Sequence, residues 1–420
     1  MKKLLLLILF LSSCSPIDTD NLKGPIYNVD DSFQSLDVLD PSSSERRTAQ
    51  IGFVEFDDLG FQKSRSAVDN VFSKIRNLNS NSNENPLLLV VFIHGWHHNA
   101  KPDDSNVTTF KKFLINLQHE EDIQNVSRHK RQVVGVYIGW RGESNDSVLN
   151  PLTYRSRKSA GLRVGQYGLQ EVLAELAKIR RSKDSNRLVS IGHSFGGGVL
   201  YSSVMQNLVE NVVMAQKEGS NQLDTIKKVY GDLVILVNPA LEAARVEVLN
   251  RRLGNVEFAQ CQPLVFASFT SEYDKALSDV FPIGQKLFFY DDKKVALQSD
   301  QQNLVITPYG NEPTYRTNEL SCKSCDYNAK AVYLNKNQFL DASKQWRAFR
   351  ESKTAEFNVG DIKLMHDPKS QIGPGTPIMN VYVKGNNLMQ DHNEIWGSEF
   401  SLFARALIGM EFARGEQCRQ

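Results

Sequence analysis

Short, continuous apolar runs alternate along this sequence with longer stretches in which apolar residues recur every three or four positions. The runs predict strands that are buried on both faces, and the longer stretches predict amphipathic helices. The predicted strands are 50–56, 87–93, 133–138, the run beginning at 188, 233–237, 264–269 and 377–383. The predicted helices are 64–78, 108–119, 160–180, a helix following residue 198, another ending near 253, and 398–413. Strands that alternate with helices indicate an α/β fold with a mostly parallel central sheet flanked by helices.

The regular alternation stops near residue 276 and resumes near residue 375. Glycine- and proline-rich turns fill this stretch, and its one predicted helix lies near 342–356. Such turns interrupt regular structure. We therefore expect one α/β domain over residues 49–415. It contains a large insertion at about 276–375 before the last strand. We expect part of this insertion to form a cap and the rest to be an irregular extension of the chain.

The first residues have the pattern of an export signal. Two lysines precede a short apolar run, which ends in Leu11-Ser12-Ser13-Cys14. The run is too short to span a bilayer, and small residues before a cleavage point are typical of a secretory signal. These four residues resemble a bacterial lipobox, which implies a lipoprotein signal peptide over 1–13 and diacylglyceryl attachment to Cys14. An ordinary secretory signal with a coincidental cysteine is the alternative.

The segment 14–48 is rich in serine, aspartate and proline and shows no period. This composition disfavours a packed core, so we expect a lipidated tether. Acyl chains on Cys14 would anchor the protein at the bacterial cell envelope while the domain stays in water. Ser15 resembles an outer-membrane sorting signal, which implies the periplasmic face of the outer membrane in a Gram-negative cell.

Composition and the number of cysteines indicate which partners and which cysteine chemistry to expect. The chain is 41% hydrophobic, and its net charge of +1 gives no sign of a nucleic-acid partner. An exported domain with an even number of remaining cysteines can form disulfides, here in three possible pairings. These cysteines are Cys261, Cys322, Cys325 and Cys418. No second C-x-x-C accompanies the one at 322–325 to complete a zinc site, so a structural disulfide within the insertion is favoured over redox or metal chemistry.

A candidate nucleophile follows the run that begins at Leu188. The run leads into Gly192-His193-Ser194-Phe195-Gly196, and a helical pattern comes next. A strand, a tight turn and a helix in this order expose the turn residue at the end of a sheet, and glycines relieve the crowding there. The next N–H lies at a helix N-terminus, where negative charge is stabilised. We interpret Ser194 as the nucleophile; a glycine-rich turn with a chance serine is the alternative.

A serine nucleophile needs a base within hydrogen-bond reach, and the base needs a carboxylate that orients it. In folds with this turn the three residues occur along the chain in the order serine, acid, histidine. Only His366 and His392 lie beyond Ser194 in the chain. His392 is favoured because it lies between the last predicted strand and the last predicted helix, where it can reach over the sheet edge.

Asp274 is the favoured acid because it comes just after the predicted strand 264–269. Parallel strands share a carboxyl edge, and ligands bind there. Glu272 is the close alternative. Asp391 is a poor candidate because adjacent side chains, here those of Asp391 and His392, point apart.

An oxyanion needs two preorganised N–H donors. We expect them to be the backbone N–H groups of Phe195, directly after the nucleophile, and of Trp96, in the loop after the strand 87–93. This loop also carries His94, His97 and His98. Without a carboxylate ligand pattern nearby, histidines bonded to backbone are favoured over a metal site.

Four segments together resemble α/β-hydrolase-fold serine hydrolases of the esterase and lipase type. They are His94-Gly95-Trp96, Gly192 to Gly197, Ser271 to Asp274, and Asp391-His392-Asn393. The resemblance covers about 50–275 and 376–415. It implies an α/β-hydrolase fold, a Ser–Asp–His triad, an acyl-enzyme intermediate and no cofactor. The separation between Asp274 and His392 is much longer than is usual in this family, because the insertion lies between them.

These expectations combine into a serine hydrolase that cleaves a carboxylic ester or thioester of a small molecule or lipid. The expected partner besides substrate is the membrane, through the lipid at Cys14. Two alternatives stay open. One is an acyltransferase or amidase with the same triad, and the other is a non-catalytic envelope lipoprotein on a hydrolase scaffold.

Overall fold

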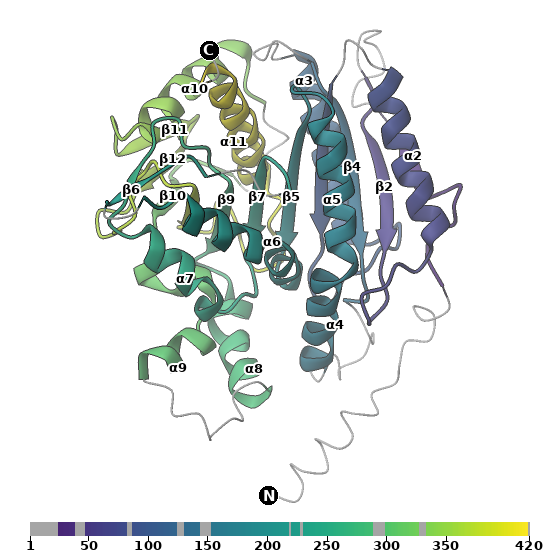
Figure 1. The fold of residues 1–420 in the computed structure, drawn as a ribbon, viewed down its shortest axis with the longest axis horizontal. Helices are drawn as coiled ribbons and strands as arrows, with labels where there is room; N and C mark the ends of the chain where they lie inside the picture. Colours follow the sequence, from purple (N-terminus) through teal and green to yellow (C-terminus); the bar gives the residue numbers. More distant parts are fainter. Residues whose placement is uncertain are drawn as a thin grey trace, which may run out of the picture.

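The computed structural model shows an α/β domain built on one large sheet (Figure 1). It describes residues 24–37, 47–81, 86–123, 130–142, 153–217, 220–226, 230–288, 299–326 and 333–418. The predicted signal peptide 1–13 and the lipidation site Cys14 lie outside these residues. Within them, no helix combines the length and the apolar character that crossing a membrane requires.

The sheet has eleven strands in the order β1-β2-β4-β3-β5-β7-β9-β13-β10-β12-β11. The strands from β2 to β10 in this order run parallel, and antiparallel strands close both edges. Their bounds are β1 Phe33–Ser35, β2 Gln50–Glu55, β3 Leu87–Ile93, β4 Gln132–Gly139, β5 Arg187–His193, β7 Leu233–Val237, β9 Phe266–Ser271, β10 Asn318–Cys322, β11 Glu356–Val359, β12 Ile362–His366 and β13 Ile378–Val383. A separate pair of short strands comprises β6 Gln222–Leu223 and β8 Glu257–Phe258.

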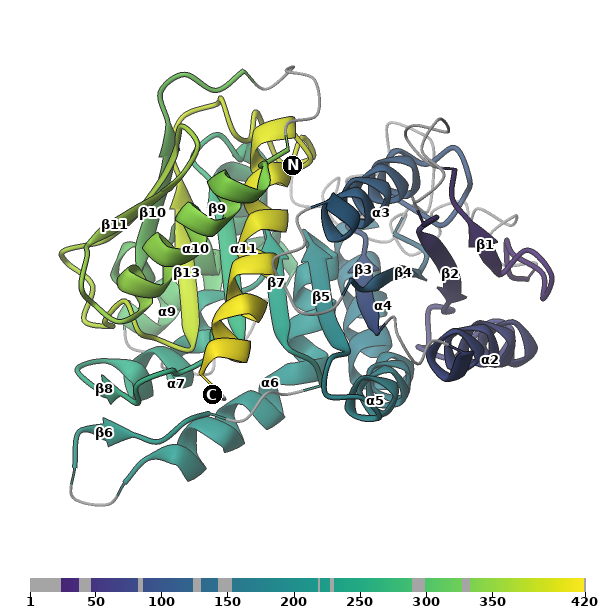
Figure 2. The same ribbon diagram turned by 90° about the horizontal axis from the view of Figure 1, so that it is seen from above.

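Helices cover both faces of the sheet (Figure 2). One face carries α3 Ser105–Ile123, α10 Lys336–Arg350 and α11 Ser398–Gln417, and the other carries α2 Arg65–Asn81, α4 Tyr154–Gln166, α5 Gly168–Arg181, α6 Phe195–Ala215 and α7 Ala243–Leu253. Alternate side chains of β3 enter different cores, Leu88, Val90 and Phe92 on one face and Leu89, Val91 and Ile93 on the other. This two-sided burial is why the strands read as unbroken apolar runs.

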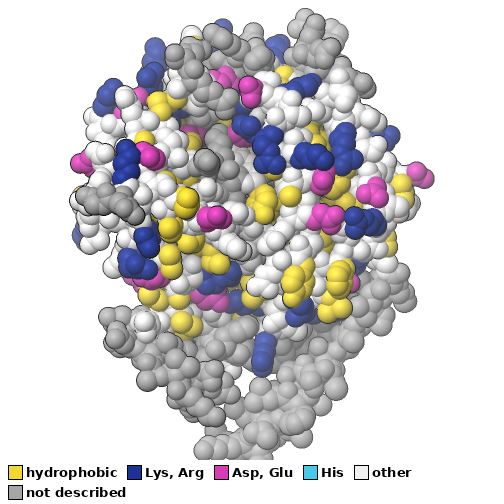
Figure 3. Space-filling model, viewed as in Figure 1, with side chains coloured by type: hydrophobic (Ala, Val, Ile, Leu, Met, Phe, Trp, Pro, Cys, Tyr) yellow, Lys and Arg dark blue, Asp and Glu magenta, His cyan; other side chains and the backbone are white. Residues whose placement is uncertain are grey.

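The exposed face of the helices α2 and α5 carries charges of both signs. Figure 3 shows basic and acidic side chains interspersed over these helices. Arg65 pairs with Glu171 at 3.2 Å, and Arg76 pairs with Glu175 at 3.0 Å, each across the two helices. The mixture agrees with the near-zero net charge.

The tether predicted over 14–48 is wrong for residues 24–37, which pack on the domain. The strand β1 pairs with β2, and the ring of Tyr27 stacks on Phe53 at 3.8 Å. The carboxylate of Glu55 accepts hydrogen bonds from the backbone N–H groups of Ile26 and Tyr27 at 3.0 and 2.9 Å. These long-range contacts stabilise a segment that has no hydrophobic period, so the local pattern did not indicate it.

The insertion predicted over 276–375 is in large part an extension of the sheet. Its strands β10, β12 and β11 continue the sheet beyond β13. They are half-buried, with polar residues at alternate positions, and therefore lack the unbroken apolar run of a central strand. The remaining elements are a π-helix at Ala276–Val280, α8 Phe281–Phe288, α9 Ser299–Ile306, 3₁₀ turns at Tyr309–Asn311 and Pro313–Tyr315, and α10, which covers Lys336–Arg350 where the sequence predicted a helix near 342–356. The helices α8 and α9 lie at the lower end of the sheet in Figure 1 and pack on α4 and α7.

The single long helix predicted over 160–180 is two helices. The helices α4 and α5 are separated at Tyr167, whose φ of −116° and ψ of −96° are not helical. A Cβ on Gly168 would lie 2.4 Å from the ring of Phe56, so close packing determines the break. The apolar spacing continues across it, which is why the sequence pattern predicted one helix.

Two disulfides resolve the pairing that the sequence left open. Cys322 is bonded to Cys325, which confirms the expected structural disulfide within the insertion. Cys261 is bonded to Cys418, with their Cα atoms 5.9 Å apart. This second bond joins the end of α11 to the loop that precedes β9.

Candidate active site

The turn between β5 and α6 presents Ser194 at the carboxyl end of the central strand. Ser194 has a φ of 54° and a ψ of −123°, a strained conformation for a residue with a side chain. A Cβ on Gly196 would lie 2.2 Å from the carbonyl oxygen of Ile93, and one on Gly192 would lie 2.7 Å from that of Gly196. Only glycine fits at these two positions, so the turn can form because the sequence supplies them.

His392 lies against the Ser194 hydroxyl. Its Nε2 is 2.7 Å from Ser194 Oγ, and its Nδ1 is 2.7 Å from Asp274 Oδ2. A carboxylate only accepts hydrogen bonds, so Nδ1–H donates to Asp274 and Nε2 accepts from the Ser194 hydroxyl. The Asp274 side chain is fully buried and that of His392 is 17% exposed. Of these two side chains, solvent therefore reaches only that of His392.

Adjacent parallel strands bring the acid and the histidine together. The strand β13 pairs with β9, with Val383 opposite Ser271, so the loops after both strands leave the sheet at one edge. Asp274 follows β9 and His392 follows β13. One carboxylate oxygen of Asp274 also accepts the Leu277 backbone N–H at 2.8 Å, which fixes the orientation of its side chain.

The alternative acids and base lie elsewhere. Glu272 accepts the Gly385 N–H at 3.0 Å, and Asp391 accepts the N–H groups of Asn393 and Glu394. His366 ends the antiparallel strand β12, opposite Asn318, the first residue of β10. None of these three contacts Ser194 among the hydrogen bonds of the described residues.

The loop after β3 runs directly against Ser194. A Cβ on Gly95 would lie 2.7 Å from Ser194 Cβ, so the backbone that leads to Trp96 passes beside the serine. Phe195 is the first residue of α6, and its N–H therefore has no acceptor within the helix. The two expected oxyanion donors thus belong to segments that flank Ser194 on either side.

His94 orients the peptide group that contains the Trp96 N–H. Its Nε2 accepts the Trp140 N–H at 3.1 Å, so Nδ1 carries the proton and donates to the Gly95 carbonyl at 2.9 Å. Burial lowers the pKa of His94 to about 4, which keeps the ring neutral. The ring also stacks on Trp140, at 5.5 Å between centroids. The sequence pattern signalled a loop histidine here but not its orienting contact.

Three aromatic rings form a wall beside Ser194. Trp96 stacks on Phe195 with centroids 5.6 Å apart, and Tyr154 meets Phe195 edge to face at 5.2 Å. The indole N–H of Trp96 donates to Thr153 Oγ1 at 3.2 Å. The three rings come from three separate elements, so no single stretch of sequence predicted this apolar wall.

The remaining histidines of the loop also have partners. His98 lies 3.2 Å from an oxygen of Asp104, and the amide nitrogen of Asn106 lies 3.0 Å from the same ring. The ring of His97 packs against Trp96 in a tilted arrangement, with centroids 4.1 Å apart. Within the described part of the chain, no group of histidine, cysteine, aspartate and glutamate side chains could hold a metal ion.

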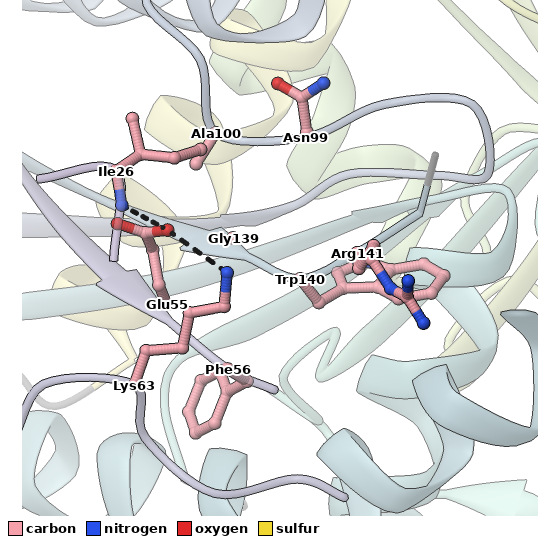
Figure 4. Close-up of a pocket in the computed structure, with 9 residues that line it drawn as sticks. All are labelled: Ile26, Glu55, Phe56, Lys63, Asn99, Ala100, Gly139, Trp140 and Arg141. Atoms are coloured by element: carbon pink, nitrogen blue, oxygen red, sulfur yellow. Dashed lines mark hydrogen bonds and ion pairs between the residues drawn. The ribbon is translucent and has the colours of Figure 1, made fainter. Parts of the chain in front are cut away.

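A small cavity lies near the carboxyl ends of β2 and β4 (Figure 4). Figure 4 shows Glu55 directed towards the Ile26 N–H, with the Lys63 ammonium 4.0 Å from its carboxylate. The cavity holds about 10 Å³. That volume suits one water molecule, so this cavity is too small for a substrate.

Two side chains without a predicted role, His193 and Asn238, reach the loop that bears His392. His193 sits inside the serine motif, and Asn238 directly follows β7. Their only sequence signal was this position at the carboxyl ends of neighbouring strands.

A comparison with protein-family models supports the fold. The model described as "Alpha/beta hydrolase of unknown function (DUF900)" matches residues 67–286, more than half of the chain. The matched region includes Ser194 and Asp274, whereas His392 lies beyond it. No curated protein and no solved structure matches the sequence significantly. The chain therefore belongs to the DUF900 family of alpha/beta hydrolases.

Proposed function

We propose that this protein is a serine hydrolase that cleaves a carboxylic ester or thioester. The observation that carries the proposal is the continuous hydrogen-bonded chain from Ser194 through His392 to the buried Asp274. A serine hydroxyl is a weak nucleophile by itself, and this arrangement supplies the base and the orienting carboxylate that activate it.

In the proposed reaction, Ser194 Oγ attacks the acyl carbon while its proton moves to His392 Nε2. The bond from Oγ to carbon forms, and the carbonyl oxygen becomes an oxyanion held by the Trp96 and Phe195 N–H groups. Collapse breaks the bond to the alcohol or thiol, which leaves with the proton from Nε2. Water then attacks the acyl-enzyme, gives its proton to Nε2, and releases the carboxylic acid as Ser194 Oγ regains a proton.

Electrostatics supports these roles. Asp274 faces Nδ1 and would stabilise the imidazolium that forms at each transfer. The neutral His94 holds the Gly95–Trp96 peptide in place, so one oxyanion donor is oriented before the substrate arrives. The wall formed by Trp96, Tyr154 and Phe195 supports an apolar acyl group beside the serine.

The proposed location is the bacterial cell envelope, through a lipid on Cys14. The support is the lipobox-like Leu11-Ser12-Ser13-Cys14 at the end of a short apolar run. An anchor of this kind would bring the site close to acylated envelope molecules, so we propose lipid esters as a substrate class. Globomycin treatment with [³H]palmitate labelling, in the full-length chain and in Cys14→Ser, tests the anchor.

A fluorophosphonate probe tests the function. Protein lacking residues 1–14 should be labelled at Ser194, as located by mass spectrometry. We expect Ser194→Ala and His392→Ala to abolish labelling, with His366→Ala as the matched control that retains it. A p-nitrophenyl ester series would then measure the preferred acyl length. Absence of labelling in folded wild-type protein would contradict the proposal and favour a non-catalytic lipoprotein.

A further inference from the structure

The backbone carbonyl of His392 receives hydrogen bonds from two side chains that lie far from it in the sequence. His193 Nε2 lies 2.8 Å from this oxygen, and Asn238 Nδ2 lies 3.1 Å from it. The Asn238 amide is also 3.2 Å from the carbonyl oxygen of Asp391. Two donors from the ends of β5 and β7 thus converge on the loop after β13.

The protonation of His193 is determined by its surroundings. A carbonyl oxygen only accepts, so Nε2 carries the hydrogen. The side chain is fully buried, and burial, together with the nearby His392, holds its pKa well below the usual range. His193 is therefore a neutral donor at neutral pH. A neutral donor adds no positive charge beside the imidazolium that forms on His392.

Asn238 is held by the strand that precedes the acid. Its Oδ1 accepts the Ser271 N–H at 2.9 Å, and its own backbone N–H donates to the Phe269 carbonyl at 2.8 Å. These contacts leave Nδ2 facing the His392 loop. Asn238 also has a φ of 44°, a left-handed conformation that asparagine tolerates better than most residues. The amide thus joins the end of β9, three residues before Asp274, to the loop of the base.

Before Asp391 the loop is held by the core, where Leu388 and Met389 are buried and the Ser271 hydroxyl donates to the Met389 carbonyl at 3.2 Å. Asp391, Asn393 and Glu394 are exposed, and the backbone bonds of this turn are local. The His392 ring could keep its two side-chain contacts only while its backbone stays in register with Ser194 and Asp274. A displacement of about 1 Å in a reacting group can cost about 100-fold in rate.

We propose that His193 and Asn238 are positioning residues that set the place of His392 through its carbonyl oxygen. This inference rests on the proposed function, because it assigns the base of that reaction. The inference gives a role to the histidine that directly precedes Ser194 and to the asparagine that directly follows β7. Neither residue touches the reacting atoms.

The test compares variants that keep or remove each donor. His193→Gln keeps a donor near the Nε2 position, and His193→Leu removes it; Asn238→Asp keeps the acceptor for Ser271 and removes the donor. We expect His193→Leu and Asn238→Asp to lower kcat and the fluorophosphonate labelling rate about 10- to 100-fold at nearly constant KM. His193→Gln should recover most of the loss. His366→Leu, a half-buried histidine away from Ser194, is the matched control.

Proton NMR provides a readout that does not depend on turnover. The His392 Nδ1–H proton bound to Asp274 should give a downfield resonance in wild type and His193→Gln that is shifted or lost in His193→Leu. If His193→Leu does not fold, Asn238→Asp decides the same question. Wild-type rate and resonance in a folded donor-free variant would overturn the inference. An unlabelled wild type would contradict the proposed function alone, and the NMR comparison would still decide the positioning role.

Discussion

The turn that holds Ser194 and the loop that holds His392 are built differently. The turn is one contiguous segment, and every residue from 187 to 201 is buried. The loop after β13 has exposed residues on both sides of His392, and distant side chains that bond it include those of His193, Asn238, Asp274 and Ser271. Local sterics therefore determine the place of Ser194, whereas long-range hydrogen bonds determine the place of His392.

This difference predicts two kinds of sensitivity. An added methyl group in the turn should damage stability and activity together. The loss of one hydrogen bond to the loop should damage activity while the domain stays folded.

Asp274→Asn should give the largest loss. The amide cannot stabilise the imidazolium and favours the wrong tautomer of His392, so we expect kcat to fall by about 10⁴-fold. The unfolding midpoint in urea should change little, because the amide oxygen can still accept the Leu277 N–H. Glu272→Gln is the matched control and should retain activity. An equal fall in kcat in both variants would show that Asp274 is not the acid.

Gly196→Ala should disrupt the turn between β5 and α6 that holds Ser194. Its Cβ would lie 2.2 Å from a backbone oxygen that cannot move without shifting β3. We expect a loss of about 3 kcal/mol or more in the free energy of unfolding, together with loss of labelling. Gly198→Ala is the control, because its nearest neighbour would be 3.3 Å away. A stable Gly196→Ala protein would show that the turn is not sterically determined.

Acid should destabilise the protein through its buried histidine in the loop after β3. The folded pKa of His94 is about 4, below its unfolded value, so the unfolded state binds this proton first as pH falls. The free energy of unfolding should therefore fall between about pH 6.5 and pH 4, by up to about 3 kcal/mol from His94. Above pH 6.5 this residue adds no pH dependence. In His94→Asn, urea titrations at several pH values should show a shallower slope, and an unchanged slope would contradict the assignment.

The smallest effect is expected at Asp58, which links the loop after β4 to α4. It pairs with Arg157 at 2.8 Å and with Arg141. Burial alone would raise its pKa, but these hydrogen bonds outweigh burial and lower the pKa to about 2. Its contribution is fully present above pH 4 and is lost as pH falls through about 2. We expect Asp58→Asn to lose about 1 to 2 kcal/mol at pH 7 by urea unfolding.

The control for Asp58 is an exposed ion pair on one helix. Glu247→Gln removes the partner of Arg251 on α7, where both side chains are exposed. Exposed pairs of this kind contribute about 0.3–0.5 kcal/mol. A similar loss in both variants would mean that burial does not strengthen the Asp58 pairs.

Much of the fold could be predicted because the hydrophobic pattern within each short stretch of sequence determines its secondary structure. The run 87–93 became β3, and the strand–turn–helix around Ser194 became β5 and α6, with the same order and nearly the same bounds. The break at Tyr167, the packed segment 24–37 and the half-buried strands β10 to β12 were missed. Each of these depends on contacts with residues remote in sequence rather than on its own hydrophobic period.

The amino-acid sequence alone was enough to predict the fold class and a glycine-flanked serine in the turn at the end of a buried strand, although the serine itself is buried rather than exposed. Periodicity and steric demand act within a few residues, so they can be read along the chain. The folded structure was needed to show which histidine lies against Ser194, which carboxylate contacts that histidine, and that His193 and Asn238 contact its backbone. Those relations arise because the parallel strands β5, β7, β9 and β13 end side by side, and this adjacency is a property of the assembled sheet.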